Sequence, residues 1–195
     1  MARWKPDAPQ RLVTAALELF EERGYEQATV PEIAERAGLT RSTFFRHFDD
    51  KREVLFGGDA MADRLAAAID EAPATAAPFE AVARGLEAAG RDFFTPDRRE
   101  FAVRRSAVID ASPELREREA LKGIGLAAAM ARALTRRGLA ALEARVIAEL
   151  GALALKIAYE RWSRETCDDE FGAVARRALD EVRAVDDRHR PERQG

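Results

Sequence analysis

Cysteine and histidine are scarce in this sequence: Cys167 is its only cysteine, and His47 and His189 are its only histidines. A single cysteine excludes a disulfide within the chain and fits a reducing, cytoplasmic setting. So few histidines and cysteines exclude most histidine-based metal sites and catalytic triads, so we expect no metal, no cofactor and no enzymatic activity. The chain also lacks an apolar run near the ~20 residues that cross a bilayer, so we expect no membrane partner.

β-Branched residues are also few. Alanine occurs 40 times among 195 residues, whereas valine, isoleucine and threonine together occur 24 times. Alanine loses no side-chain entropy in a helix, whereas β-branched residues do. The net charge of −3 excludes a strongly basic nucleic-acid-binding scaffold, although a local basic patch remains compatible with it. The composition therefore predicts an all-α protein.

Start and stop signals divide the first part of the chain into short helices. Apolar residues at helical spacing mark residues 10–23, and Gly24 ends that helix. Thr29 and Glu32 have the spacing of a capping box, which predicts a second helix. Gly38 ends it and permits a sharp turn.

Further capping signals continue along the chain. Thr40 is placed to cap a third helix, and Asp50 to start a fourth that runs towards residue 70. Two prolines make residues 72–78 the clearest linker. Beyond it, Thr95 and Ser112 each precede a proline, as N-caps often do.

The last part of the chain has longer helical patterns. Gly138 separates two long helices, and residues 139–163 carry two adjacent apolar stripes that must be covered on two sides. Residues 168–185 form a last amphipathic pattern. We interpret Arg136 and Arg137 as solvated residues at a helix end. The sequence predicts three parts: a domain of short helices at 1–56, a larger helical domain at 57–185, and a flexible tail at 186–195.

The stretch from Thr29 to Leu55 is typical of a helix-turn-helix. Ala34 and Ala37 are small enough for two helices to cross closely, and Leu39 and Phe48 are placed to anchor the second helix to the first. A helix of this size fits the major groove of B-DNA. We expect six of its side chains to face outward: Arg41, Ser42, Thr43, Phe45, Arg46 and His47.

This stretch closely resembles the DNA-binding domain of the TetR family of bacterial transcription regulators. The resemblance covers residues 10–56 and rests on the following motifs: Gly24-Tyr25, Thr29, Ile33-Ala34, Ala37-Gly38-Leu39, Thr43-Phe44-Phe45, His47-Phe48 and Lys51. It implies a DNA-binding set formed by Thr29, Thr40, Arg41, Ser42, Thr43, Phe45, Arg46, His47 and Lys51. Within that set, Arg41 is placed to pair with guanine, and Lys51 to meet a phosphate of the backbone. The family usually has tyrosine where this chain has Phe45, so we expect one phosphate hydrogen bond fewer.

The summed charge of residues 1–56 is unfavourable for binding to DNA, because they contain nine Lys and Arg and ten Asp and Glu. Binding to DNA depends on the charge of the surface that faces the DNA rather than on the summed charge of the domain, and residues 40–52 carry four cations. Arg3 and Lys5 add charge in a terminal arm. Because the basic patch is small, we expect a shallow salt dependence of DNA binding.

The two stripes on residues 139–163 favour a dimer interface, and the family resemblance implies a four-helix bundle between two subunits that bind a palindromic operator. The residues expected to pair the subunits lie on the last two long helices: Val146, Leu150, Gly151, Leu153, Ala154, Ala158, Phe171, Val174, Ala178 and Val182.

The resemblance also implies a pocket for a small-molecule effector among the middle helices. The large apolar and cationic candidates are Phe93, Phe94, Phe101, Arg104, Arg105, Met130 and Trp162. The alternative is that the aromatic residues are ordinary core and the arginines solvated surface. Residues 104–116 and 160–162 resemble the acyl-CoA-binding branch of the family, which implies an apolar, acyl-type effector.

Taken together, the residues and the resemblance predict a dimeric, ligand-responsive transcription regulator, most simply a repressor. The alternative is a helical interaction or sensor protein of the same fold that binds DNA weakly or not at all. Cys167 is followed by three acidic residues, which raise a thiol pKa and argue against a reactive cysteine. Asp168 and its acidic neighbours are better interpreted as a helix start than as a metal site.

Overall fold

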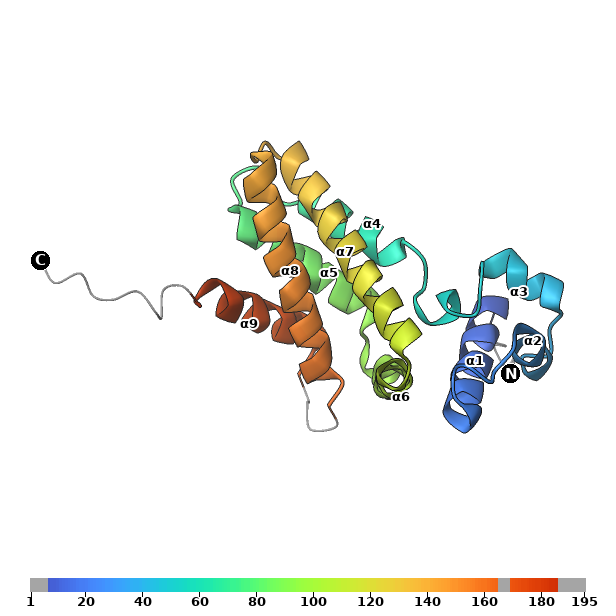
Figure 1. Ribbon diagram of the computed structural model, residues 1–195. Helices are drawn as coiled ribbons and strands as arrows, with labels where there is room; N and C mark the ends of the chain where they lie inside the picture. Colours follow the sequence, from blue (N-terminus) through green and yellow to red (C-terminus); the bar gives the residue numbers. More distant parts are fainter. Residues whose placement is uncertain (1–6, 165–168, 186–195) are drawn as a thin grey trace, which may run out of the picture. The chain divides into compact units, whose positions relative to one another are not determined.

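The computed structural model describes residues 7–164 and 169–185, and over these ranges it contains helices and no strand. The chain divides into two compact units, each formed by two separate stretches of sequence. Figure 1 labels their helices. The all-α prediction is confirmed.

The first unit contains Met1–Gly58 together with Phe101–Lys122. Its elements are α1 (Ala8–Arg23), α2 (Val30–Arg36), α3 (Arg41–His47), the 3-10 turn η1 (Glu53–Leu55), most of α6 (Arg99–Ala111) and the first half of α7 (Pro113–Arg136). Val108, Ile109 and Leu115 of the later stretch lie in one buried apolar cluster with the residues of α1, α2 and α3. The N-terminal helices therefore share their core with residues that follow 50 or more positions later.

The predicted caps of the first helices are present. Gly24 ends α1 with φ of 82°, a left-handed value that glycine adopts readily. Thr29 and Glu32 form a reciprocal capping box at the start of α2. The Thr40 side chain accepts a hydrogen bond from the Thr43 amide at the start of α3.

The predicted helix from Asp50 towards residue 70 is wrong. Asp50 Oδ1 accepts hydrogen bonds from the amides of Arg52 and Glu53, but the residue before the short turn η1 is Arg52, and no side chain caps η1. Gly57 and Gly58 follow with positive φ, and α4 (Ala60–Asp70) begins after them. Asp50 therefore forms a local turn and does not start a helix, and the glycine pair separates η1 from α4.

The second unit contains Asp59–Glu100 and Gly123–Gly195. Its helices are α4, α5 (Pro78–Phe93), the rest of α7, α8 (Ala141–Trp162) and α9 (Phe171–Arg183), with the 3-10 turn η2 (Pro96–Arg98) after α5. α5 packs against α4, α8 and α9, and its buried face consists mainly of alanine and glycine. The predicted linker at 72–78 lies between α4 and α5, and Gly138 lies between α7 and α8.

Arg137 does not lie in solvent as the sequence suggested. Its guanidinium donates hydrogen bonds to the carbonyl of Ile69 in the last turn of α4 and to those of Ala72 and Pro73 in the loop that follows. Arg136 pairs with Asp70, with Nη2 and Oδ2 2.6 Å apart. The arginine pair therefore fixes the end of α7 to the end of α4.

Two helical glycines of the second unit have opposite surroundings. A Cβ atom added at Gly125 in α7 would meet no atom within 4 Å, whereas one at Gly151 in α8 would lie 2.8 Å from Val82 Cγ1 and 3.3 Å from Met130 Sδ. Gly151 therefore permits close packing of α8, and Gly125 only weakens its helix.

Replacement of these two glycines by alanine should change stability in opposite directions. Gly125→Ala should raise the free energy of unfolding by about 1 kcal/mol, because alanine has the higher helix propensity and meets no neighbour. Gly151→Ala should lower it by about 1–3 kcal/mol, because the added methyl overpacks the core. Chemical denaturation of the two variants measures both changes; a shift of the same sign in both would contradict this packing.

Candidate nucleic-acid interface

The orientation of α3 is set by Phe44. This side chain is fully buried, and its ring contacts those of Phe45 and Phe48 with centroids 5.5 Å away in each case. Phe48 packs against the same buried cluster, as predicted. Because the ring of Phe44 faces the core, the opposite side of this seven-residue helix faces solvent.

The solvent-facing side of α3 carries most of the predicted DNA-binding residues. All of the following are exposed: Thr40, Arg41, Ser42, Phe45, Arg46 and His47. Thr43 is half-buried, and its hydroxyl lies 2.9 Å from that of Thr40. The structure thus brings these seven residues together on one short helix and its cap.

Phe45 is exposed to 45% although it is a large apolar side chain. The guanidinium carbon of Arg41 lies 5.4 Å from the centroid of the Phe45 ring, within the range of a cation–π contact. Phe45 therefore restricts where Arg41 can point. This is a positional role that a phenyl ring fulfils without a hydroxyl.

The turn between α2 and α3 is rigid. Gly38 has φ of 64°, and the Leu39 amide donates a 2.8 Å hydrogen bond to the Ala34 carbonyl. Arg11 of α1 donates hydrogen bonds to the carbonyls of Ala37 and Gly38. The crossing of α2 and α3 is therefore held both by the buried alanines and by an arginine from outside the motif.

Thr29 lies exposed at the start of α2, where its amide donates a 3.0 Å hydrogen bond to Glu32 Oε2. The hydrogen bonds from Thr29 hold the pKa of the Glu32 carboxyl below its usual value. The carboxylate therefore stays charged, and it keeps the N-terminus of α2 capped at neutral pH.

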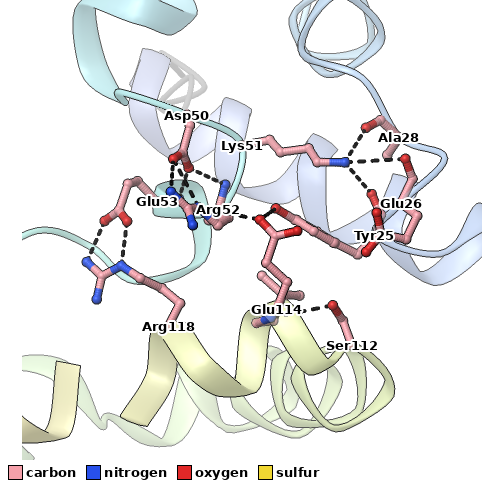
Figure 2. A network of polar contacts seen from close by, with 11 residues as sticks. Tyr25, Glu26, Ala28, Asp50, Lys51, Arg52, Glu53, Ser112, Glu114 and Arg118 are labelled. Atoms are coloured by element: carbon pink, nitrogen blue, oxygen red, sulfur yellow. Dashed lines mark hydrogen bonds and ion pairs between the residues drawn. The ribbon is translucent and has the colours of Figure 1, made fainter. Parts of the chain in front are cut away.

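Lys51 lies apart from this exposed face (Figure 2). Its ammonium donates hydrogen bonds to the carbonyls of Tyr25 at 2.8 Å, Ala28 at 3.2 Å and Glu26 at 3.3 Å. It also lies 4.1 Å from the centroid of the Tyr25 ring. The structure therefore directs the Lys51 ammonium at the loop between α1 and α2, which differs from the phosphate contact expected from the resemblance.

Residues of α7 complete this polar network (Figure 2). Tyr25 Oη donates a 2.8 Å hydrogen bond to Glu114 Oε1, and the same carboxylate oxygen lies 3.5 Å from Arg52 Nε. Burial and then the hydrogen bond to Glu114 raise the pKa of the Tyr25 phenol far above its ordinary value, so the phenol remains a donor. Arg118 donates two hydrogen bonds to Glu53, at 2.5 and 2.6 Å.

Three of the predicted effector-binding residues belong to this first unit instead. Arg104 pairs with Glu21 through two hydrogen bonds of 2.9 and 2.6 Å. Arg105 donates a 2.8 Å hydrogen bond to the Leu55 carbonyl, and Phe101 packs against the buried cluster. These side chains attach residues 101–122 to the N-terminal helices. The spacing of residues in the sequence did not predict this attachment.

The other four effector-binding candidates lie in the second unit. Phe94 stacks on Phe171 with centroids 4.0 Å apart and meets Trp162 at 5.9 Å, while Phe93 is half-buried. Met130 is fully buried beside Gly151. The seven candidates are therefore divided between the two units.

The predicted dimer residues also divide into two groups. Six are buried within the single chain: Gly151, Ala154, Ala158, Phe171, Val174 and Ala178. Val146 and Leu153 are exposed to 49% and 46%, whereas Leu150 and Val182 are half-buried. On α8, the inner stripe (Gly151, Ala154 and Ala158) is therefore covered by the protein's own helices, although we expected it to lie between subunits. The outer stripe, which contains Val146 and Leu153, remains uncovered.

Several predicted features lie outside the described residues: Arg3, Lys5, Cys167, Asp168, His189 and the tail at 186–195. Within the described part of the chain, no three acidic, histidine or cysteine side chains gather as a metal site would require. None of the helices described there has the length and apolar character that crossing a membrane demands.

Comparison with known proteins places this geometry in a known group. Residues 12–56 match the family described as bacterial regulatory proteins, tetR family. The transcriptional regulator TcmR of Streptomyces glaucescens is 40% identical over 79 residues, which are 40% of this chain and 35% of TcmR. The transcriptional regulator SrpR of Pseudomonas putida is 48% identical over 46 residues, which are 24% of this chain and 22% of SrpR. The chain thus matches only about a third or less of the length of these relatives.

Solved structures share the fold over most of the chain. The regulator FadR of Bacillus subtilis, in complex with stearoyl-CoA, has a TM-score of 0.56 at 21% identity and covers 89% of this chain and 96% of its own. SmeT, the repressor of a multidrug efflux pump of Stenotrophomonas maltophilia, has a TM-score of 0.55 at 20% identity and covers 90% and 88%. At these identities the likeness establishes the fold of the chain.

Proposed function

We propose that residues 12–56, which match the tetR family of bacterial regulatory proteins, form a helix-turn-helix domain, and that the protein is a sequence-specific transcription regulator that binds duplex DNA. The observation that carries the proposal is the exposed polar face of α3. Arg41, Ser42, Arg46 and His47 point to solvent from a helix that Phe44 anchors to the core. A helix presented in this way fits the major groove, where its N-terminal residues meet base edges.

The role of each side chain follows from its position on α3. Arg41 lies in the first turn and is restrained by Phe45, so we assign it the reading of guanine. Arg46 and His47 lie in the last turn, where we assign them to backbone phosphates. Thr29, Thr40, Ser42 and Thr43 supply hydroxyls at the starts of the two helices.

We propose that the protein is a homodimer through the outer stripe of α8. Leu142, Val146 and Leu153 are exposed to 76%, 49% and 46% and lie on one side of the helix, with Leu150 and Ile157 half-buried beside them. An uncovered apolar stripe of this length favours association with a second helix. Two-fold symmetry would then present two recognition helices to a palindromic operator.

We further propose that a small apolar effector controls the affinity for the operator, most simply by releasing a repressor. Such control requires that the effector bind the two states of the protein with different affinities. The second unit supplies the aromatic side chains for this role, among them Phe93, Phe94 and Trp162. Native mass spectrometry of the purified protein tests for a bound apolar molecule.

The main alternative is an interaction or sensor protein of this fold that binds DNA weakly or not at all. Exposed Phe45 and the excess of acidic residues in positions 1–56 favour it. An enzyme is the weaker alternative, because the relatives that match are transcription regulators. Direct measurement of DNA binding separates the first alternative from the proposal.

Arg41→Ala should reduce the discrimination between an operator and unrelated DNA by about 1–3 kcal/mol, because the variant loses its contact with a base edge. Fluorescence anisotropy with DNA flanking the protein's own gene and with a scrambled duplex measures this difference. Arg91→Ala, which removes an exposed arginine from α5, is the matched control and should leave both affinities unchanged. A folded dimer that binds neither duplex at low salt would favour the interaction protein.

A charge placed on the outer stripe of α8 should separate the subunits. The double variant Val146→Glu and Leu153→Glu should be a folded monomer, because two carboxylates would have to be desolvated in the interface. Light scattering after size-exclusion chromatography gives the mass. Ala128→Glu, at an exposed apolar position of α7, should remain dimeric; a double variant that stays dimeric would place the interface elsewhere.

A further inference from the structure

Arg11 lies in the first turn of α1, outside α2 and α3, and its guanidinium reaches the turn that joins those two helices. Its Nη2 donates hydrogen bonds to the carbonyl of Ala37 and, at 3.3 Å, to the carbonyl of Gly38. The side chain is half-buried, so these hydrogen bonds are partly shielded from solvent. Arg11 thus links α1 to the point at which the chain changes direction between α2 and α3.

The end of α2 leaves carbonyls that need a donor from elsewhere. The Leu39 amide donates a 2.8 Å hydrogen bond to the Ala34 carbonyl and so closes the last turn of the helix. Carbonyls past the last helical hydrogen bonds need a side chain or water as donor, and for Ala37 and Gly38 that donor is Arg11. The positive charge strengthens the contact, because the C-terminus of a helix carries a partial negative charge.

Gly38 allows Arg11 to come this close. Its φ of 64° lies in the left-handed region, and a Cβ atom added there would lie 2.8 Å from Arg11 Nη2. The guanidinium therefore occupies space that a side chain at position 38 would need. The left-handed backbone of the turn and the contact with Arg11 consequently depend on the same residue.

α3 begins directly after this turn. Leu39 packs against the buried cluster, and Thr40 caps the helix. Because α3 has only seven residues, its own hydrogen bonds give it little stability, and its direction depends on what holds it from outside. Phe44 holds it in its middle, and the turn holds it at its start. A side chain that fixes the turn therefore also fixes the place where α3 begins.

We propose that Arg11 is a positioning residue, which from α1 fixes the turn at Ala37 and Gly38 and thereby the start of α3. Its effect on DNA affinity rests on the proposed DNA-binding function, whereas the restraint of the turn does not. Arg11 needs no contact with DNA for this role. It acts through the backbone carbonyls of the turn.

Removal of the Arg11 donors should leave the domain folded. An open hollow lies beside the turn, and its lining includes Arg11, Thr14, Glu18 and Arg36. Water can therefore reach the carbonyls that Arg11 binds and replace its hydrogen bonds in part. The expected effect is a looser turn on an intact apolar core.

The test compares Arg11→Met, which keeps an unbranched side chain and removes its donors, with Arg11→Lys, which keeps the charge and has three donors. Gln10→Met, at the exposed neighbouring position of α1, is the matched control. Circular dichroism establishes that each variant is folded. Two readouts are then taken: amide hydrogen exchange of Gly38 and Leu39 without DNA, and affinity across a salt series for the duplex that flanks the protein's own gene.

Without DNA, exchange of the Gly38 and Leu39 amides should be about tenfold or more faster in Arg11→Met, because hydrogen bonds from a charged donor are lost. Arg11→Lys should lie between this variant and the wild type, and the control should match the wild type. The amide of Leu19, in the buried part of α1, should change by less than about threefold, because the opening is local. Unchanged exchange at the turn, or equal acceleration at the turn and at Leu19, would overturn the proposal.

With DNA, Arg11→Met should bind about tenfold more weakly, and the slope of log affinity against log salt should not change. Arg11→Lys should restore part of the lost affinity. An arginine that neutralises a phosphate would instead lower the magnitude of the slope by about 0.9 per protomer. A lowered slope, or unchanged affinity in Arg11→Met, would contradict the positioning role. A wild-type protein that binds no duplex would refute the DNA-binding function alone, and the exchange experiment would still decide whether Arg11 restrains the turn.

Discussion

The burial of Phe44 is the contact on which the functional surface depends. In a seven-residue helix, only one side can face the core, and the fully buried Phe44 ring determines which side that is. The proposed function requires that Arg41, Arg46 and His47 be exposed, and their exposure follows from this orientation of α3. A helix this short has little stability of its own, so tertiary packing and the Thr40 cap must hold it.

The N-terminal domain does not build its core alone. Val108, Ile109 and Leu115 complete the apolar cluster beneath α1 to α3, and ion pairs from Arg104 and Arg118 surround it. Residues 101–122 therefore belong to the same compact unit as α1 to α3 although they lie far from these helices in sequence.

Local features of this structure could be predicted from the sequence, and tertiary assignments could not. Thr29, Thr40, Gly24 and Gly38 act within a few residues of themselves, so the caps and turns were predicted correctly. Both stripes of α8 are apolar in sequence, and only the structure distinguishes the buried one from the exposed one.

The contacts of single charged side chains with distant parts of the chain could not be predicted from the sequence either. Lys51, Arg105 and Arg137 each bind backbone carbonyls that lie 23 or more positions away. Arg137 was expected in solvent, and that prediction is wrong, because the spacing of charges carries no information about a distant loop. The phosphate contact expected of Lys51 and the effector contact expected of Arg105 stay predictions. The measurement that tests the central claim most directly is amide chemical-shift mapping of the labelled protein with and without its operator. We predict that the largest changes fall on residues 40–47 and on the start of α2. Changes confined to the second unit, or none at low salt, would contradict the account.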